Sequence, residues 1–281
     1  MVTSTAERLG GHAVQAGRML EGLSRERGVR AELLPINPRL PGPLRLLQRV
    51  KYVRTLVTWP VYVLSLLVKL PRYDVVHVFA ASYLSFLLTP TPAILIAKLY
   101  GKPVLLNYRS GEAEDHLARW RRTTIPTLRL ADRVIAPSGY LVDVFARFNI
   151  EASAIFNIVE ADRFRFRERR RLRPIFFSNR NLESLYNVEC TLRAFAIIQQ
   201  RFPEASLIVA GDGGERERLE ELARELALRN VEFKGRVSPE KMHELYAAAD
   251  IYLNTPDIDN MPASILEAFA SGLAVVTTDA G

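Results

Sequence analysis

The chain has 281 residues, of which 48% are hydrophobic, so it can bury two cores of ordinary domain size. Its single cysteine, Cys190, cannot form an intramolecular disulfide, and the residues after Met1 lack the basic start and apolar run of a secretory signal, so we expect a cytoplasmic protein. The net charge of +7 and isoelectric point of about 9.7 favour an anionic partner, which could be nucleic acid, an anionic membrane surface or a phosphorylated substrate.

The first feature in chain order is a glycine pair, Gly10 and Gly11, directly before a predicted helix at 13–27. Backbone without side chains can approach a phosphate or a sugar closely at such a place. Only a short stretch precedes Gly10, and its pattern is not strand-like, so we expect hardly any strand before the pair. The first sheet would then be incomplete and the chain would begin late.

An uncharged apolar segment lies between Arg54 and Lys69. It is shorter than the roughly 18 to 20 residues that span a bilayer and it contains Pro60, so we expect no transmembrane helix. A buried helix is the favoured interpretation. A helix lying in a membrane interface is the alternative, because Trp59 is part of the segment and basic residues come before it, namely Arg45, Arg49, Lys51 and Arg54.

Beyond this segment, short apolar runs alternate with helical patterns, which is typical of doubly wound parallel sheets. The predicted strands are 74–79, 103–107, 133–136, 205–210, 230–233 and 251–254. After the helix at 13–27, the predicted helices are 92–100, 140–148, 188–202, 215–228 and 239–249. Ligands of such sheets bind beyond the carboxyl ends of the strands, so the loops that follow the strands are the candidate functional segments.

A run of arginines divides the alternating pattern into two blocks. Its members are Arg163, Arg165, Arg167, Arg169, Arg170, Arg171 and Arg173. A solvated interdomain linker is the favoured interpretation, and a phosphate or membrane contact is the alternative. We place the domain boundary between Asp162 and Pro174, with an amino-terminal domain at 1–165 and a carboxy-terminal domain at 166–281.

The most informative segment follows the predicted strand 251–254. Pro262 suits the first turn of a helix, and Gly272 suits its end. The backbone amides from about Met261 to Ser264 would form an anion site suited to a diphosphate. Asp259 and Glu267 flank the same helix start, and carboxylates accept hydrogen bonds from the hydroxyls of sugars and ribose. Taken alone, such a pair is more often a helix-dipole partner plus an exposed helix charge.

The full string from Asn260 to Thr278 resembles the donor-site signature of the retaining glycosyltransferase family 4, also called glycosyl transferases group 1. That family normally has two glutamates with seven residues between them, and here Asp259 takes the first place. The resemblance implies the GT-B fold: two facing Rossmann-like αβα domains, in this chain both incomplete at the ends. It also implies that Asp259 holds the hydroxyls of the transferred sugar and that Glu267 holds the donor ribose.

The resemblance extends over most of the chain and implies further donor contacts. Arg180 matches an arginine that binds the donor diphosphate, whereas Tyr186 falls near the place of a lysine and supplies no charge. Arg236 and Val237 match residues that meet the nucleobase. A glycine turn at 211–214 is interpreted as structural. The implied donor-binding residues are Gly10, Gly11, Tyr186, Arg236, Val237, Asn260, Met261, Pro262, Ala263 and Ser264.

On the acceptor side, the loop after the strand 103–107 often carries a histidine in the family, and this chain has Arg109 there. Arg109 could bind a phosphate or an acidic acceptor, but it cannot exchange protons near neutral pH. His116, further along the loop, is a weak candidate for the missing histidine, because a single histidine on a surface loop is usually solvated.

We therefore expect a hexosyltransferase-like enzyme that transfers a sugar from a UDP- or GDP-linked donor, with retention of configuration and without a metal or other cofactor. The acceptor could be lipid-linked or a polysaccharide, and the protein could sit peripherally at the inner face of the plasma membrane. No nucleic acid partner is expected. The alternative is a fragmentary or catalytically impaired member that binds nucleotide sugar without turnover, which Tyr186 and Arg109 favour. An NAD enzyme is disfavoured because the required glycine spacing is absent.

Overall fold

The computed structural model describes residues 1–3, 11–38, 40, 48 and 50–280. They form two compact units, Met1–Ile158 and Val159–Gly281, each with its own parallel sheet and core. The observed boundary, after Ile158, precedes the boundary that we expected after residue 165. Val159 and Phe164 pack into a core of the second unit, which is why that unit begins before the arginine run.

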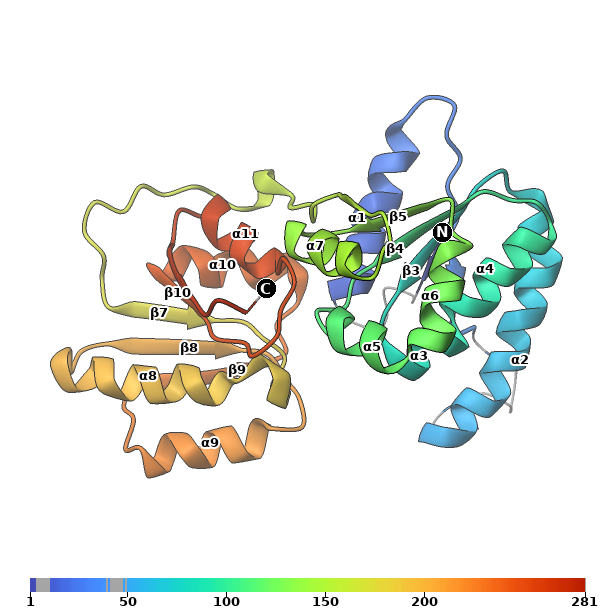
Figure 1. Ribbon diagram of the computed structural model, residues 1–281. Coiled ribbons are helices and arrows are strands. Elements are labelled where there is room, and N and C mark those ends of the chain that lie inside the picture. Colours follow the sequence, from blue (N-terminus) through green and yellow to red (C-terminus); the bar gives the residue numbers. More distant parts are fainter. Residues whose placement is uncertain (4–10, 39, 41–47, 49, 281) are drawn as a thin grey trace. The chain divides into compact units, whose positions relative to one another are not determined.

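The first unit is built on a six-stranded parallel sheet in the order β2-β1-β3-β4-β5-β6 (Figure 1). The strands are β1 (Val2–Thr3), β2 (Leu34–Pro35), β3 (Val76–Ala80), β4 (Val104–Tyr108), β5 (Arg133–Ala136) and β6 (Ser153–Ala154). The helices are α1 (Gly11–Arg25), α2 (Lys51–Lys69), η2 (Leu70–Arg72), α3 (Tyr83–Leu88), α4 (Pro90–Leu99), α5 (Ala113–Arg119), α6 (Arg121–Arg129) and α7 (Gly139–Arg147). One core fills the unit, with Val78, Leu106 and Phe145 fully buried in it.

A first strand exists, contrary to our expectation from the residues before Gly10. Val2 and Thr3 are buried and pair in parallel with Leu34 and Pro35 of β2, and Val2 also faces Val78 of β3. Two residues are too few to give a periodic signal, so the pattern could not reveal this strand. Gly10 lies outside the described residues, and Gly11 begins α1.

The segment around Pro60 is one continuous helix, α2, and it is only half buried. Tyr62 and Leu66 are fully buried against the core, whereas Leu56 and Leu64 are 76% and 60% exposed. The expectation of a buried helix is therefore wrong for one side of it. Of the helices described, this is the one that is long and apolar enough to cross a membrane, on length and composition alone: the stretch Val53–Arg72, of which 22% is buried.

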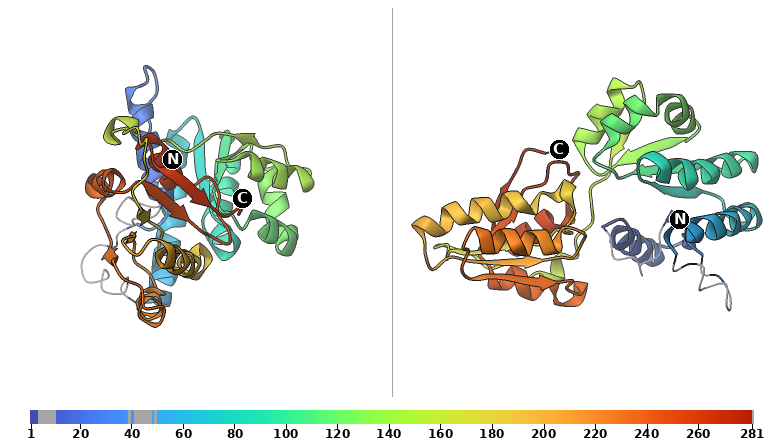
Figure 2. Two further views of the ribbon diagram at one scale, coloured as in Figure 1. Left: turned by 90° about the vertical axis from the view of Figure 1, so that its left-hand side faces the viewer. Right: turned by 90° about the horizontal axis from the view of Figure 1, so that it is seen from below.

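The second unit has a five-stranded parallel sheet in the order β11-β10-β7-β8-β9. The strands are β7 (Ile175–Ser178), β8 (Ser206–Ala210), β9 (Val231–Gly235), β10 (Ile251–Asn254) and β11 (Ala274–Thr277). The helices are η3 (Ala161–Arg163), η4 (Ser184–Tyr186), α8 (Val188–Arg201), α9 (Arg216–Glu225), α10 (Pro239–Ala248) and α11 (Ala263–Ala270). Helices α8 and α9 cover one face of the sheet and α10 and α11 the other, so each face has its own core (Figures 1 and 2).

Part of the arginine run is structural rather than a solvated linker. Arg167, Arg169 and Arg173 all pair with Asp250, a carboxylate that is 1% exposed just before β10. The guanidinium of Arg169 is itself buried, at 3% exposed, and donates to the carbonyls of Ala249 and Ser271 at 2.8 and 2.6 Å. The run thus fastens the start of the second unit onto its own helices.

Candidate functional site

The strand order of the second unit indicates where a ligand should bind. From β7 the chain moves in one direction through β8 and β9, and then returns to the other side of β7 with β10 and β11. Ligands of open α/β sheets bind at this reversal, beyond the carboxyl ends of the two adjacent strands. Here those strands are β7, which is followed by Arg180, and β10, which is followed by Asp259. Because all five strands are parallel, their following loops meet at one edge of the sheet.

Arg180 connects the two loops at this point. Its Nη2 atom lies 2.8 Å from Asp259 Oδ2, and its Nη1 atom donates to Ser264 Oγ at 3.4 Å. The carbon at the centre of its guanidinium lies 4.2 Å from the centroid of the Tyr186 ring. The side chains of Arg180 and Asp259 are 11% and 15% exposed, so the pair lies near the surface but is largely desolvated. Tyr186 supplies no charge; its ring supports the face of the guanidinium by a cation–π contact.

The glycine turn after β8 fixes the backbone under Arg180. A Cβ atom on Gly211 would lie 2.0 Å from the Arg180 carbonyl oxygen, and one on Gly213 would lie 2.3 Å from the Leu182 carbonyl oxygen. Gly211 also has a φ of +143°, which L-residues rarely adopt. The turn is therefore structural, as expected, and its two glycines let the β7 loop lie directly against it.

The loop after β10 contains a residue with a left-handed backbone conformation. Met261 has a φ of +50°, which is uncommon for a residue with a side chain. Asp259 Oδ1 accepts a hydrogen bond from the Asn260 amide at 2.8 Å. Upstream in the same loop, Asp257 accepts from the Asn187 side chain at 2.6 Å, which joins the loop to the β7 side of the reversal. The local conformation thus holds the Asp259 carboxylate toward Arg180.

Helix α11 places Glu267 on the same polar network. The helix begins at Ala263 with Pro262 as its N-cap, one residue later than the sequence indicates. Its end at Gly272 is confirmed: the Leu273 amide donates to the Ala268 carbonyl at 3.0 Å and the Gly272 amide to Phe269 at 2.9 Å, a Schellman motif. This geometry presents the amino-terminal turn of α11 at the carboxyl edge of the sheet.

Sequence reasoning missed the residues that link Glu267 to the rest of the site. The hydroxyl of Tyr246, on α10, lies 3.2 Å from Glu267 Oε2 and donates to the Ser264 carbonyl at 2.9 Å. Asn179 Oδ1 accepts from Tyr252 at 2.5 Å, and its amide donates to Tyr246 at 3.1 Å. Burial raises the pKa of Tyr246 well above its ordinary value, so the hydroxyl stays protonated. Asn179 directly precedes Arg180, so its position beside a predicted site residue could have identified it from the sequence. Tyr246 in α10 and Tyr252 in β10 are buried aromatic residues, and nothing in the sequence distinguishes them from ordinary core residues.

Arg236 and Val237 directly follow β9 at the same edge. Arg236 is exposed, and Val237 is half-buried against the core that α10 and α11 cover. The structure therefore brings Arg180, Tyr186, Asp259, Ser264 and Glu267 into one network. Arg236 and Val237 lie on the same edge of the sheet, two strands from β7.

In the first unit, the structure separates Arg109 from His116. His116 is 0% exposed, and its ring nitrogens lie 2.8 Å from the Tyr108 hydroxyl and 3.1 Å from Thr124 Oγ1. Burial lowers the pKa of His116 to about 4. His116 is thus a core residue rather than an acceptor contact, because α5 turns it inward between β4 and α6. Arg109 follows β4 and is half-buried, with its Nη2 donating to the Asn157 side chain.

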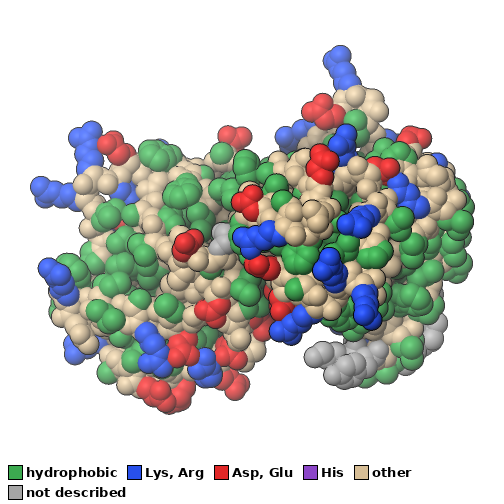
Figure 3. Space-filling view, in the orientation of Figure 1, with side chains coloured by type: hydrophobic (Ala, Val, Ile, Leu, Met, Phe, Trp, Pro, Cys, Tyr) green, Lys and Arg blue, Asp and Glu red, His purple; other side chains and the backbone are tan. Residues whose placement is uncertain are grey.

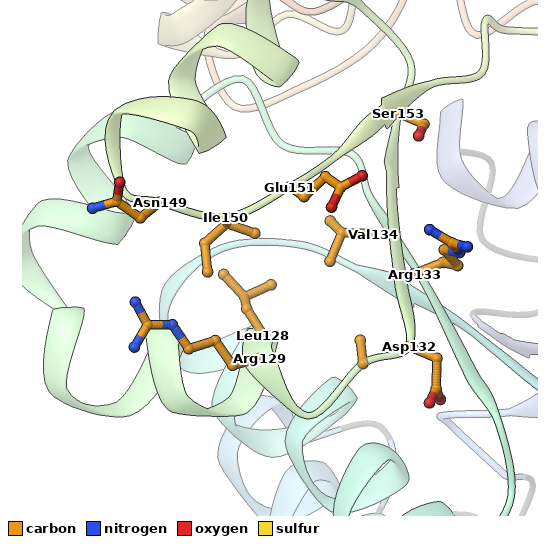
Figure 4. A pocket seen from close by; sticks show the side chains of 10 residues that line it. Leu128, Arg129, Asp132, Arg133, Val134, Asn149, Ile150, Glu151 and Ser153 are labelled. Atoms are coloured by element: carbon orange, nitrogen blue, oxygen red, sulfur yellow. The ribbon is translucent and has the colours of Figure 1, made fainter.

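A pocket in the first unit lies away from these residues. It has a volume of about 210 Å³ and is lined by Leu128, Arg129, Ala131, Asp132, Arg133, Val134, Asn149, Ile150, Glu151 and Ser153 (Figure 4). Arg133 is the first residue of β5, so the pocket opens at the amino ends of the strands. Functional groups of such sheets gather at the opposite edge, where Arg109 lies. We therefore assign the pocket no role.

Two parallel α/β units, with a charged network at the strand reversal of the second, have the architecture of the GT-B fold. Residues 6–157 match the family described as "Glycosyl transferase 4-like domain", and residues 160–281 match "Glycosyl transferases group 1". The chain belongs to this glycosyltransferase family, as the donor-site segment indicates.

Individual relatives are distant. Alpha-monoglucosyldiacylglycerol synthase of Streptococcus pneumoniae is 32% identical over 91 residues, which are 32% of this chain and 21% of that protein. Sulfoquinovosyl transferase SQD2 of Arabidopsis thaliana is 25% identical over 228 residues, 74% of this chain and 43% of that protein. Among solved structures, sucrose-phosphate synthase from Thermosynechococcus elongatus aligns with a TM-score of 0.75 at 17% identity, covering 100% of this chain and 81% of that one. The matches thus span less than half the length of both relatives.

Proposed function

We propose that the protein transfers a hexose from a UDP- or GDP-linked donor to an acceptor hydroxyl, with retention of configuration at the sugar. The observation that carries this proposal is the network Asp259–Arg180–Ser264–Tyr246–Glu267 at the strand reversal. Membership of the glycosyltransferase family supports the reaction class. The family resemblance supports a donor bound mainly by the second unit and an acceptor bound mainly by the first.

Each group of the network has a chemical task in the proposed reaction. The bond between the anomeric carbon and the diphosphate oxygen breaks, and its electron pair goes to the diphosphate. Arg180 and the amino-terminal turn of α11 stabilise that charge, so no metal or other cofactor is needed. The acceptor oxygen forms the new bond to the anomeric carbon, and its proton passes to the departing diphosphate oxygen. Asp259 accepts hydrogen bonds from the sugar hydroxyls and stabilises the positive charge that develops on the sugar, while Glu267 accepts from the ribose.

The remaining donor contacts follow from the same assignment. Arg236 and Val237 would meet the nucleobase. The segment at 260–264, from Asn260 to Ser264, would surround the diphosphate. Gly10 and Gly11 would let the start of α1 approach the donor closely. Tyr186 would orient Arg180 rather than bind phosphate, because its ring is already stacked on the guanidinium.

A thermal-shift screen with UDP-, GDP- and ADP-sugars tests the donor site. One nucleotide sugar should raise Tm, and Glu267→Ala should weaken its binding about 10- to 100-fold, because a hydrogen bond to a charged group contributes roughly 1.5–3 kcal/mol. Glu244→Ala is the matched control, since Glu244 is an exposed glutamate on neighbouring α10. A nucleotide sugar that binds Glu267→Ala as tightly as the native protein would contradict the assignment.

One observation favours the alternative of a binder without turnover. Asp259 already neutralises Arg180 in this structure, and Tyr186 brings no second cation, so the net positive charge available to a leaving diphosphate is small. A protein of this kind would still bind the nucleotide sugar. Release of free UDP or GDP over time, with a broad acceptor panel present, separates the two functions: steady release supports the transferase, and saturable binding without release supports the binder.

We further propose that the acceptor is lipid-linked or part of a polysaccharide and that the protein works at the inner surface of the plasma membrane. Hydrophobic side chains gather over α2 and α4 (Figure 3). The exposed members are Leu56, Trp59, Val61, Leu64, Leu67, Val68, Leu95 and Leu99, which we call the α2–α4 face. Basic residues border it, among them Arg54, Lys69 and Arg72. An apolar face with a basic border suits an anionic membrane interface. Nucleic acid is not a proposed partner, because Arg167, Arg169 and Arg173 are bound to Asp250.

A further inference from the structure

Arg109 is a cation that no carboxylate among the described residues neutralises. It follows β4, and its backbone amide donates to the Ala80 carbonyl at 3.0 Å, which holds it beside the end of β3. Among the described residues, its side chain has one hydrogen-bond partner, the neutral amide of Asn157, and no carboxylate shifts its pKa. Its Nε atom is buried without a partner.

The surroundings of Arg109 are apolar or basic. The guanidinium carbon lies 5.8 Å from the centroid of the Phe79 ring, and Phe79 stacks on His77 at 5.0 Å. Burial lowers the pKa of Arg109 to about 10. Burial, the terminal amino group and Arg109 together lower the pKa of His77 to about 4, so this ring is neutral near pH 7.

The acidic residues that follow Arg109 in sequence are bound elsewhere. Glu112 accepts from Ser82 at 3.0 Å, and Asp115 accepts from Tyr83 at 2.5 Å. A buried charge without a partner is costly, and proteins normally pair such charges. An arginine kept in this state is suited to an anion that arrives from solution, and its planar fork suits a phosphate or a carboxylate.

We propose that Arg109 binds an anionic group, a phosphate or a carboxylate, carried by the acceptor. This inference rests on the proposed function, and it adds the chemical class of the acceptor. Arg109 belongs to the first unit, whereas the residues assigned to the donor diphosphate belong to the second. Its role is recognition rather than proton transfer, because an arginine stays protonated near neutral pH.

Titration with inorganic phosphate tests the site without any turnover. The full chain carries Arg180→Gln in all samples, which removes the cation assigned to the donor diphosphate. Adding Arg109→Gln should weaken phosphate binding on the order of 10- to 100-fold, whereas Arg109→Lys, which keeps the charge but loses the planar fork, should weaken it less. Arg121→Gln is the matched control, because Arg121 is an exposed arginine of the same unit. Equal phosphate affinity with and without Arg109 overturns the proposal.

Two further measurements separate recognition from other roles. Without phosphate, Arg109→Gln should leave Tm equal or higher, since it removes a half-buried charge that no described carboxylate pairs; a fall of several degrees means that Arg109 is structural and overturns the proposal. The affinity of UDP and GDP for the otherwise native protein should be unchanged by Arg109→Gln. An equal loss of nucleotide affinity means that the anion is the donor diphosphate. Phosphate binding at Arg109 without any nucleotide binding would leave this site intact and reject the proposed function alone.

Discussion

At the scale of single residues, Asp250 joins three arginines and thereby stabilises the second unit, a role that its place in the sequence does not indicate. Its carboxylate is buried and accepts from the Arg173 amide at 2.8 Å, as well as from the side chains of Arg169 and Arg173. These hydrogen bonds hold the pKa of Asp250 well below its ordinary value. Removing a single member of a buried ionic group leaves the others uncompensated, which costs more than the group itself contributes.

We expect Asp250→Ala to lower the free energy of unfolding of the second unit by about 3–5 kcal/mol, because three arginines lose their common partner. Urea unfolding followed by far-ultraviolet circular dichroism measures the change. Asp212→Ala is the control, since Asp212 is exposed and its nearest cation, on Arg216, lies 3.9 Å away; a change below about 0.5 kcal/mol is expected there. A loss no larger than that of the control would show that the arginines are satisfied by carbonyls alone.

At the scale of elements, α2 combines a buried side with an exposed apolar one. Leu56 and Leu64 belong to the exposed side. Burial of each side chain in a membrane interface should stabilise the bound state by about 1.5–3 kcal/mol. We expect the protein to bind vesicles that contain anionic phospholipid at low salt, and Leu56→Asp together with Leu64→Asp to weaken this binding at least about tenfold.

Flotation of the protein with such vesicles measures the effect. Ile197→Asp serves as the control, because Ile197 is an equally exposed hydrophobic residue on α8 of the second unit. Native protein that fails to float at low salt, or a double variant that floats as well as the native protein, would reject the assignment of the α2–α4 face to a membrane.

The same elements show what the sequence could and could not predict. Strands β3, β4, β5, β8 and β10 gave clear apolar runs, and the Gly272 helix end was readable because glycine is the usual residue at that position. Strand β7 is as long as β5 and β10, but it was missed because its residues follow the arginine run and Pro174, a stretch that was interpreted as a linker. Pairings such as Arg180 with Asp259, and Arg169 with Asp250, join loops far apart in sequence. No local pattern encodes them, whereas the family resemblance located both Arg180 and Asp259.

At the scale of the whole molecule, the two units should respond differently to acid. In the first unit, burial lowers the pKa of His116 to about 4, below its ordinary value of about 6.5. The unfolded chain therefore binds the proton more readily, so stability present above pH 6.5 is lost as pH falls toward 4, by at most about 3 kcal/mol. In the second unit, the lowered pKa of Asp250 has its effect only below about pH 4, where the unfolded carboxylate takes up a proton.

We therefore expect two thermal transitions, of which that of the first unit moves to lower temperature between pH 7 and pH 5 while that of the second unit stays nearly constant. Differential scanning calorimetry between pH 7 and pH 4 measures both transitions. His116→Gln should reduce the pH dependence of the transition of the first unit by about half, because His77 of the same unit also has a pKa lowered to about 4, and should leave the transition of the second unit unchanged. A transition of the second unit that falls first on acidification would contradict this prediction.

The ion pairs of Asp250 with Arg167, Arg169 and Arg173 also affect how long the second unit stays folded. Asp250 and Arg173 are 77 positions apart, so their contact requires a long stretch of chain to be in place first. Contacts of such separation form late, because the entropy of closing the loop has to be overcome before they contribute. Interactions absent from the transition state slow unfolding without speeding folding. In kinetic terms, we expect the three arginines to lengthen the lifetime of the native second unit rather than to raise the rate at which it forms.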